Sequence, residues 1–236
     1  MLYLIGLGLN VNGISKQGLL AIKKCSKIYL ENYTVNFPYT LEELSKVLGV
    51  NLISLNRADV ESDKLIIESK KENIALLIYG CPLFATTHTS LIIEARKKKV
   101  KTQIIYSASI FDAVAETGLQ LYKFGKTTSM PAWKKNFTPD SFVDVVKENL
   151  SIKAHSLILC DIGLEFPQAL EQFEESLANK NLKLDKILVC SSMGTEKSKI
   201  IYNSINELKK IQLKMPFCII VPGDLHFAEK EFLENF

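Results

Sequence analysis

Six consecutive apolar residues, Ile74 to Tyr79, constrain the fold of this chain more than any other stretch. A run of this length without a charge is typical of a strand that is buried on both faces of a sheet. It ends at Gly80-Cys81-Pro82, where glycine permits unusual dihedral angles and proline removes a backbone donor. In open α/β sheets, ligands bind beyond the carboxyl ends of central strands. We therefore expect the loop over residues 80–89 to belong to the active site.

The first half of the sequence alternates between strand and helix patterns. Strands are predicted over residues 1–7, 27–30, 51–55, 74–79 and 102–106. Helices are predicted after Ser15, after a capping box formed by Thr40 and Glu43, after Asp63, and after the threonine cluster of the central loop, which offers N-caps. Such alternation favours a mostly parallel sheet.

The pattern changes near residue 110, where we place a domain boundary. Beyond it, one helix is predicted to end at Gly118, and Thr138-Pro139 is predicted to cap another. Strands are predicted over residues 156–160, 186–190 and 217–221. An amphipathic helix that carries Leu170, Phe173 and Leu177 is predicted between the first two of these strands. Residues 199–210 fit either strand or helix. We therefore expect an α/β protein with an N-terminal domain over residues 1–110 and a C-terminal domain over residues 111–236.

Composition limits the classes of protein that this chain can belong to. With 47% hydrophobic and 23% charged residues, it has the make-up of an ordinary globular protein. Its apolar runs are too short for a membrane helix, and the apolar N-terminus lacks the basic start of a signal peptide. The five cysteines and three histidines are scattered, so neither a disulfide framework nor a metal site is expected. A cytoplasmic protein is the plain interpretation.

The basic residues are almost all lysines, since Arg57 and Arg96 are the only arginines. Bidentate recognition of phosphates and guanine edges favours arginine, so this scarcity argues against a nucleic-acid enzyme. Lysines 97–99 are interpreted as a solvated helix end rather than as a binding patch. Trp133, beside Lys134 and Lys135, is expected to be exposed and to contact a partner.

Gly6-x-Gly8 follows the first strand and invites comparison with dinucleotide-binding loops. The third glycine of that motif would fall on Val11, and Glu31, an acid at about the right distance, has no further support. A tight strand-to-helix turn is therefore favoured over a nicotinamide site. The sequence contains no G-x-S-x-G, Walker A or H-E-x-x-H motif. Two interpretations of His88 stay open: it is a catalytic base, or it caps a helix or packs inside the protein.

Several blocks of sequence match one family in order along almost the whole chain. They are Leu4-Ile5-Gly6-Leu7-Gly8-Leu9, Gly80 to Thr89 (G-C-P-L-F-A-T-T-H-T), Ser109-Ile110, Gly118 to Thr127 (G-L-Q-L-Y-K-F-G-K-T), Lys147-Glu148-Asn149, His155, Cys160-Asp161-Ile162 and Val221 to His226. On these residues the chain resembles the diphthine synthases, a branch of the tetrapyrrole-methylase-like class of S-adenosylmethionine (SAM) methyltransferases. One departure is Cys81, because the loop of the family normally reads Gly-Asp-Pro-Leu.

The resemblance implies a two-domain α/β fold, with a mostly parallel sheet in the first domain, a mixed sheet with helices in the second, and SAM in the cleft between them. It implies methylation of the amino group of the modified histidine of translation elongation factor 2 in diphthamide biosynthesis, with S-adenosylhomocysteine as product. It also implies a homodimer without a membrane or direct nucleic-acid partner. The residues that it predicts to contact SAM are Leu9, Cys81, Phe84, Ser109, Ile110, Cys160, Met193 and Phe217. By position, His88 and Asp161 are the candidates for a base.

Three alternatives stay open at this point. A tetrapyrrole methyltransferase would share the fold and the cofactor but would act on a corrin or porphyrin precursor. An RNA methyltransferase of the same class is disfavoured by the scarcity of arginine. A non-catalytic SAM-binding protein is conceivable because Cys81 replaces the acid of the family.

Overall fold

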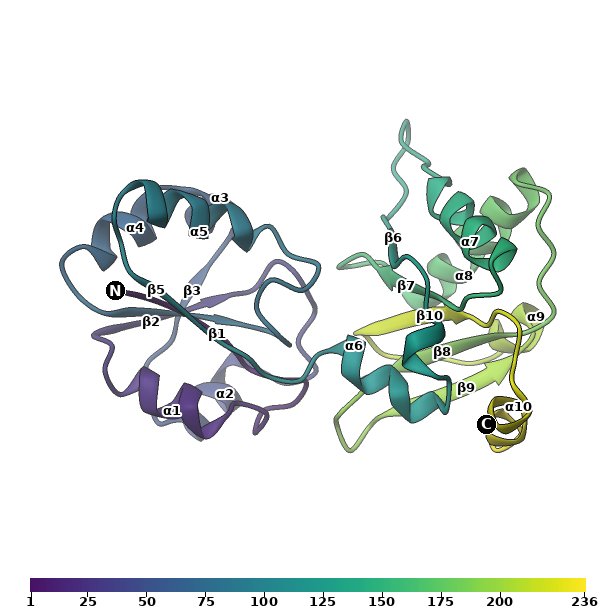
Figure 1. The fold of residues 1–236 in the computed structure, drawn as a ribbon, viewed down its shortest axis with the longest axis horizontal. Helices are drawn as coiled ribbons and strands as arrows, with labels where there is room; N and C mark the ends of the chain where they lie inside the picture. Colours follow the sequence, from purple (N-terminus) through teal and green to yellow (C-terminus); the bar gives the residue numbers. More distant parts are fainter. The chain divides into compact units, whose positions relative to one another are not determined.

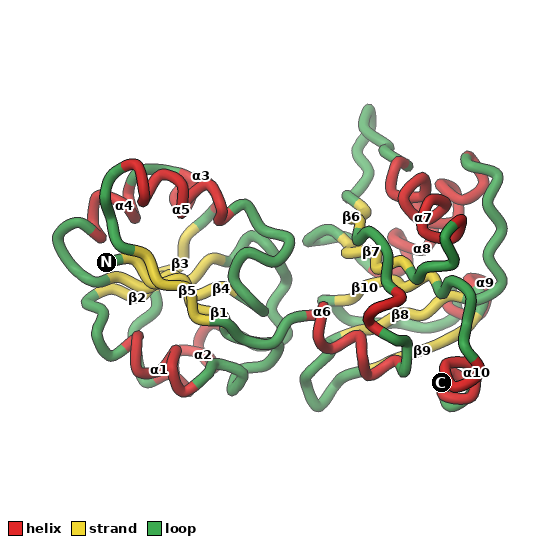
Figure 2. Tube along the Cα trace, viewed as in Figure 1, coloured by secondary structure: helices red, strands yellow, loops and turns green.

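The structure, a computed structural model, describes residues 1–236 and divides into two compact units, Met1–Asp112 and Ala113–Phe236. The sequence places a domain boundary near residue 110, close to this division. Each unit is built on its own five-stranded sheet (Figures 1 and 2). None of the helices combines the length and the apolar character that crossing a bilayer requires.

The sheet of the first unit is entirely parallel. Its strands are β1 (Leu2–Gly6), β2 (Lys27–Glu31), β3 (Ile53–Leu55), β4 (Ile74–Ile78) and β5 (Thr102–Ile105), in the spatial order β3-β2-β4-β1-β5. Every residue of the central strand β4 is buried. The predictions of a parallel sheet and of a central strand buried on both faces are confirmed.

Helices cover both faces of this sheet (Figure 1). On one face lie α1 (Lys16–Ile22) and α2 (Leu41–Leu48), and on the other lie α3 (Arg57–Glu61), α4 (Lys64–Ser69) and α5 (His88–Lys97). Alternate residues of β4 enter two separate apolar clusters, since Ile78 packs with Leu91 of α5 and Leu77 packs with Ile22 of α1. Because all five strands are parallel, their carboxyl ends meet at one edge, and so do the loops that follow them.

Local sequence signals explain how most of these helices begin. Ser15 caps α1, and Thr40 and Glu43 form the predicted capping box of α2. The prediction that the threonine cluster caps α5 is wrong, since the hydroxyl of Thr87 at the N-cap makes no capping bond. Thr87 has φ −88° and ψ 3°, whereas a capping residue is typically extended. The sequence pattern does not predict α3, whose N-cap is Asn56.

The second unit is a mixed sheet with helices, as the resemblance implies. Its strands are β6 (Thr128–Met130), β7 (Ser156–Cys160), β8 (Ile187–Ser191), β9 (Lys199–Asn203) and β10 (Phe217–Val221), in the order β6-β7-β10-β8-β9. Only β6 and β7 are parallel, and the other neighbours are antiparallel. The helical segments from residue 110 onward are α6 (Ile110–Ala113), η1 (Val114–Thr117), η2 (Leu121–Lys123), α7 (Ser141–Ser151), α8 (Phe166–Asn179), α9 (Ile205–Leu208) and α10 (Phe227–Leu233).

Three local predictions for this part of the chain have different outcomes. Asp140, not Thr138, occupies the N-cap of α7, because Pro139 lies before the helix instead of beginning it. The ambiguous residues 199–210 form a strand, β9, and then a short helix, α9. The apolar face predicted for α8 is confirmed, since its three predicted residues are buried in the core of this unit.

A buried carboxylate ties α10 to the rest of the second unit. Glu229 is 1% exposed and accepts four hydrogen bonds, from Lys123 Nζ, His155 Nε2 and the backbone N–H groups of Gln120 and His226. The other ring nitrogen of His155 accepts from the Gly223 N–H at 2.8 Å, so Nε2 carries the ring proton. Burial alone raises the pKa of Glu229, but these hydrogen bonds outweigh it and lower the pKa from 4.5 to about 2.

We expect the second unit to lose stability as the pH falls below neutrality. Burial lowers the pKa of His155 below its ordinary value of 6.5, against the opposing effect of Glu229. The unfolded chain then binds the proton more readily, so the stabilisation is complete above pH 6.5 and declines as the pH falls through it. The pKa of the Glu229 carboxyl is about 2 in the folded protein against 4.5 ordinarily, so the folded protein loses further stability as the pH falls from 4.5 toward 2.

Urea unfolding at a series of pH values measures this dependence. The free energy of unfolding should fall steadily from neutrality into the acid range, and the slope should be smaller in a His155→Gln variant. A free energy that stays flat from neutrality down to about pH 4 would contradict the expected titration of these groups.

Candidate functional site

The loops after β1 and β4 are joined by a short backbone bridge. The Gly8 N–H donates to the Gly80 carbonyl at 3.1 Å, and the Gly80 N–H donates to the Gly8 carbonyl at 3.0 Å. Both glycines have left-handed φ values, 72° and 70°, which residues with a Cβ adopt only with strain. The glycine loop and the Gly-Cys-Pro loop therefore form one continuous backbone surface at the carboxyl edge of the sheet.

The close approach of these loops requires glycine at position 6. A Cβ on Gly6 would lie 2.6 Å from the Gly80 carbonyl oxygen and 2.8 Å from Cδ of Pro82. It would also lie 3.0 Å from Cβ of Ser107, in the loop after β5, whose hydroxyl donates to the Gly13 carbonyl at 2.8 Å. The glycine motif thus serves the close packing of three loops, which agrees with its interpretation as a tight turn.

Five residues that the sequence predicts as SAM contacts lie on these three loops or directly after them. They are Leu9 after β1, Cys81 and Phe84 after β4, and Ser109 and Ile110 after β5. Leu9, Cys81 and Ser109 are buried, whereas Phe84 is 46% exposed and its ring meets the Phe111 ring edge-on at a centroid distance of 5.3 Å. Ser109 is fixed by Asp112, whose carboxylate accepts from the serine N–H at 2.7 Å and from its hydroxyl at 2.9 Å. The structure therefore brings the five predicted residues of the first unit to one edge of its sheet.

The loop over residues 80–87 holds a strained backbone. Leu83 and Ala85 have φ values of 72° and 53°, in the left-handed region that favours glycine. Such conformations cost roughly 1–3 kcal/mol each and persist only where the surrounding structure holds them, commonly at ligand sites. The strain therefore supports residues 80–87 as part of the functional site.

The other three predicted contacts lie at one edge of the second sheet. Cys160 ends β7, Phe217 begins β10, and Met193 follows shortly after β8. Because β10 is antiparallel to both β7 and β8, its start meets their ends. The Phe217 ring packs edge-on against Phe166 in the core at 5.4 Å, which leaves the backbone of Phe217 for any contact with a ligand.

Comparison with known proteins assigns the family. The family model of the tetrapyrrole (corrin/porphyrin) methylases matches residues 1–209. This chain belongs to the tetrapyrrole methylases. The assignment confirms the family that the sequence motifs predict, and with it the two-sheet α/β fold.

Relatives within the tetrapyrrole methylases narrow the assignment. A diphthine synthase of Methanocaldococcus jannaschii is 41% identical over 251 residues, which cover 99% of this chain and 98% of that protein. A diphthine methyl ester synthase of Schizosaccharomyces pombe is 34% identical over 266 residues, which cover 100% of this chain and 94% of that protein. A crystal structure of a diphthine synthase has a TM-score of 0.89 at 33% identity and covers 100% of this chain and 95% of its own. Within the tetrapyrrole methylases, this chain belongs to the diphthine synthases.

Neither candidate for a base in this tetrapyrrole methylase is a free acid–base group. His88 is 1% exposed, and its Nε2 lies 2.9 Å from the Glu31 carboxylate. Asp161 is exposed, and its carboxylate accepts from the backbone N–H groups of Ile162 at 2.9 Å and Ala132 at 3.2 Å. The burial of His88 favours its interpretation as a packing residue over that of a base that reaches a substrate.

Glu31, which the sequence offers only as an unsupported ribose-binding acid, is in the structure the partner of His88. It ends β2, and its second carboxylate oxygen accepts from the Thr34 hydroxyl at 2.5 Å. The carboxylate is therefore engaged inside the protein and is not free to bind the ribose of a nicotinamide cofactor. A charged residue at the end of an apolar strand is the signal that could have been used, because a buried carboxylate needs a partner.

An aromatic cluster that the sequence analysis also misses covers the glycine loop. The Tyr79 hydroxyl donates to the Leu9 carbonyl at 3.0 Å. The Tyr79 ring meets Phe37 edge-on at 5.3 Å, and Phe37 meets Tyr39 at 5.4 Å. Burial raises the pKa of Tyr79 well above its ordinary value, so the phenol keeps the proton that it donates. No local sequence pattern predicts these contacts, because they join segments far apart in the sequence.

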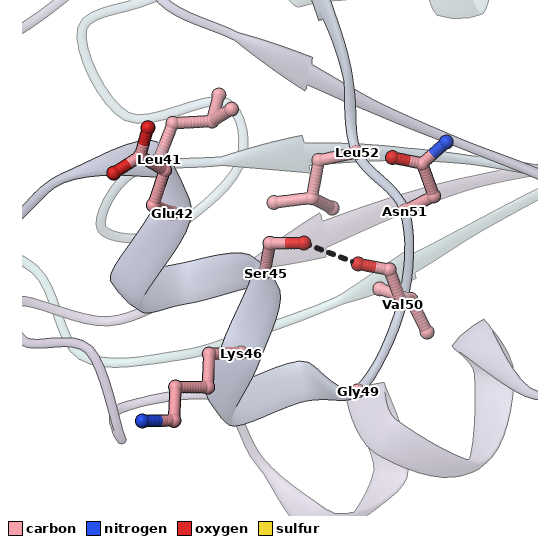
Figure 3. A pocket seen from close by; sticks show the side chains of 8 residues that line it. All are labelled: Leu41, Glu42, Ser45, Lys46, Gly49, Val50, Asn51 and Leu52. Carbon is pink, nitrogen blue, oxygen red and sulfur yellow. Dashed lines mark hydrogen bonds between the residues drawn. The ribbon is translucent and has the colours of Figure 1, made fainter.

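One open depression lies beside α2 (Figure 3). It has a volume of about 630 Å³ and is lined by α2 and by the segment that leads into β3. Figure 3 shows Ser45 on α2 donating to the Val50 carbonyl, at 2.6 Å. The depression contains none of the predicted site residues, and we do not assign it a function.

Two lysines at the end of α5 form ion pairs with acidic neighbours. Lys97 Nζ lies 2.5 Å from the Glu94 carboxylate, and Lys98 Nζ lies 2.5 Å from the Asp63 carboxylate. Exposed pairs of this kind contribute little to stability. These contacts favour the interpretation of residues 97–99 as a solvated helix end.

Trp133 is not the freely exposed residue that the sequence predicts. Its indole N–H donates to the Pro139 carbonyl at 3.1 Å, and its backbone N–H donates to the Gln172 side chain at 3.0 Å. The side chain is half-buried. The prediction of an exposed tryptophan is therefore wrong, because the segment that follows Trp133 turns back and satisfies the ring nitrogen.

Proposed function

We propose that this diphthine synthase uses SAM to methylate the amino group of the modified histidine of translation elongation factor 2. The family assignment over almost the whole chain supports the class of reaction. The observation that carries the proposal is the backbone surface where the loops after β1, β4 and β5 meet, because it holds five of the predicted SAM contacts together.

The residues of this surface fit a SAM molecule. Leu9, Phe84 and Ile110 offer apolar side chains against which adenosine and the methionine chain can pack. The position of Gly80 is not crowded, since a Cβ built there would be in ordinary van der Waals contact with Ser109 at 3.8 Å. The left-handed backbone at Gly8 and Gly80 allows backbone groups to approach a ligand closely.

Methyl transfer to an amine requires the amine and the methyl group to be positioned correctly, but it requires no nucleophile from the protein. When bound, SAM supplies an electrophilic methyl group, to which the amine nitrogen bonds while the carbon–sulfur bond breaks with its electrons on sulfur. The protein has to hold amine and methyl about 3 Å apart and in line, which contributes several kcal/mol. Apolar residues such as Leu9 and Phe84 exclude water from the reacting atoms. The ammonium product releases its proton to solvent, so the buried His88 is not required as a base.

One experiment tests the proposal and separates it from its alternatives. The protein is incubated with methyl-labelled SAM and with elongation factor 2 that carries the unmethylated precursor. Label on the elongation factor is the expected result. Transfer to a corrin or porphyrin precursor alone would indicate a tetrapyrrole methyltransferase, and binding without any transfer would indicate a non-catalytic SAM-binding protein. Absence of both heat and thermal stabilisation at millimolar SAM would end the methyltransferase proposal, because a ligand of the native state must stabilise it.

The thiol at position 81 gives a prediction of its own. An aspartate there would carry a full negative charge near the sulfonium of SAM, whereas a thiol is a weak hydrogen-bonding group. We therefore expect SAM affinity to rest on backbone contacts and apolar burial. A Cys81→Ala variant should keep SAM binding within about tenfold, or about 1.4 kcal/mol, when measured by calorimetry. Cys81→Asp should bind SAM as well or better, most visibly at low salt. A loss beyond a hundredfold in Cys81→Ala would show that the thiol itself is a needed contact.

We further propose a cytoplasmic homodimer that binds elongation factor 2 directly, without a membrane or nucleic-acid partner. The resemblance to the diphthine synthases and the scarcity of arginine support this assembly and this choice of partner. Sedimentation equilibrium of the purified protein should give twice the mass of the chain. A monomer at all micromolar concentrations would contradict the dimer.

A further inference from the structure

Glu31 and His88 form a buried pair on the sheet face that α5 covers. His88 Nε2 lies 2.9 Å from Glu31 Oε2, and the side chains are 1% and 0% exposed. Beyond this contact, neither ring nitrogen of His88 nor Glu31 Oε2 has a hydrogen-bond partner. The only other polar contact of the pair is the Thr34 hydroxyl, which donates to Glu31 Oε1.

The pair differs from the other buried acid–histidine pair of the protein. Glu229 collects four hydrogen bonds, and His155 is bonded through both ring nitrogens. Breaking one partner of a buried ion pair is costly, but replacing a whole pair by apolar side chains of similar volume is often neutral or stabilising. A pair with as few partners as Glu31–His88 is therefore poorly suited to stabilise the fold. Its position in the fold points to another role.

That position is the end of the strained loop. His88 directly follows the loop over residues 80–87, and Glu31 ends the strand next to β4, because Leu30 pairs with Leu77. At its other end the loop is held by the bridge between Gly8 and Gly80. The left-handed residues Leu83 and Ala85 lie between these two anchors and need the surrounding structure to hold them.

From these contacts we propose that the Glu31–His88 pair positions the loop over residues 80–87 and thereby sets the affinity for SAM, without touching the reacting atoms. The proposal rests on the proposed function, because Cys81 and Phe84 of this loop are proposed SAM contacts. Without the pair, the start of α5 is released and the loop spends part of its time in conformations that do not bind. The apparent affinity then falls in proportion to the fraction of molecules that stay competent.

A double variant separates positioning from stability. Glu31→Leu combined with His88→Leu removes the pair but keeps an apolar filling, so thermal unfolding should shift little. SAM affinity, measured by calorimetry, should fall at least about tenfold if the loop is competent in a tenth of the molecules or fewer. Hydrogen exchange of the amides of residues 80–87 should speed up in the SAM-free protein. His88→Gln, which keeps a donor toward Glu31, should restore most of the affinity.

Tyr29→Phe is the matched control. Tyr29 lies on the same strand and the same sheet face as Glu31, and its hydroxyl donates to the Glu68 carboxylate at 2.5 Å. Removing this hydroxyl should lower the thermal unfolding midpoint but leave SAM affinity and loop exchange unchanged. If it weakens SAM binding as much as the double variant does, general destabilisation explains the effect and the proposal fails.

The remaining outcomes are also decisive. A folded double variant with unchanged affinity and unchanged loop exchange would overturn the proposal. If the double variant does not fold, the single variants His88→Leu and Glu31→Leu decide, because each removes the contact and the proposal requires faster loop exchange in each. If the unaltered protein does not bind SAM at all, the proposed function fails, whereas the exchange measurement on residues 80–87 still tests the positioning by itself.

Discussion

Replacing Gly6 by alanine is expected to weaken SAM binding by about a hundredfold, or about 2.7 kcal/mol. The new methyl group would lie 2.6 Å from the Gly80 carbonyl oxygen and 2.8 Å from the Pro82 ring. Both contacts are far too short, so the Gly-Cys-Pro loop would have to move away from the glycine loop and carry Cys81 with it. Calorimetry with SAM, alongside thermal unfolding of the free protein, measures the two consequences.

Gly49→Ala is the matched control for this substitution. Gly49 has a left-handed φ of 65°, but a Cβ there would meet nothing within 4 Å. Alanine at this position should cost roughly 1–2 kcal/mol of stability through backbone strain alone and leave SAM binding intact. If Gly6→Ala binds SAM as tightly as Gly49→Ala does, the loops after β1 and β4 do not form the SAM surface.

Replacing Glu229 by alanine is expected to lower the free energy of unfolding by roughly 3–5 kcal/mol, because buried donors of a charged network are left without an acceptor. The Lys123 ammonium and the His155 ring lose their acceptor, and so do two backbone N–H groups. Urea unfolding at neutral pH measures the loss. Glu229→Gln should show most of the same loss in the free energy of unfolding, because a glutamine cannot accept from all four donors.

Glu231 supplies the comparison for the network. It lies on the same helix, α10, and is exposed. Glu231→Ala should change the free energy of unfolding by less than about 0.5 kcal/mol, as surface substitutions generally do. A loss below about 1 kcal/mol in Glu229→Ala would mean that the contacts of this carboxylate contribute no more than ordinary hydrogen bonds.

The parts of the fold that the sequence predicts correctly are those that depend on local pattern. The uncharged run from Ile74 to Tyr79 favours a strand buried on both faces, and the alternation of strands and helices around it favours a parallel sheet. The capping box of Thr40 and Glu43 is read correctly for the same reason, since both of its hydrogen bonds close within one turn. Five predicted site residues meet because each follows a strand of one parallel sheet.

The errors arise where contacts between distant segments decide the local structure. Thr87 has the chemistry of a cap, yet α5 begins where the buried contact of His88 with Glu31 fixes the chain. Glu31 is visible in the sequence as an acid at a strand end, but its partner is brought near only by the pairing of β2 with β4. Trp133 beside two lysines resembles an interface residue until the Pro139 carbonyl is seen to bind its ring nitrogen.

The placement of the only tryptophan gives this protein a built-in optical probe. Trp133 belongs to the second unit, so selectively excited indole fluorescence follows the unfolding of that unit alone. Its hydrogen bond to Pro139 and its half-buried ring mean that solvent contact increases when the unit opens, which shifts the emission to longer wavelength. Far-ultraviolet circular dichroism sees the helices of both units together. Coincident midpoints from the two signals would show that the units melt as one cooperative body, and separated midpoints would allow the stability of each to be measured without cutting the chain.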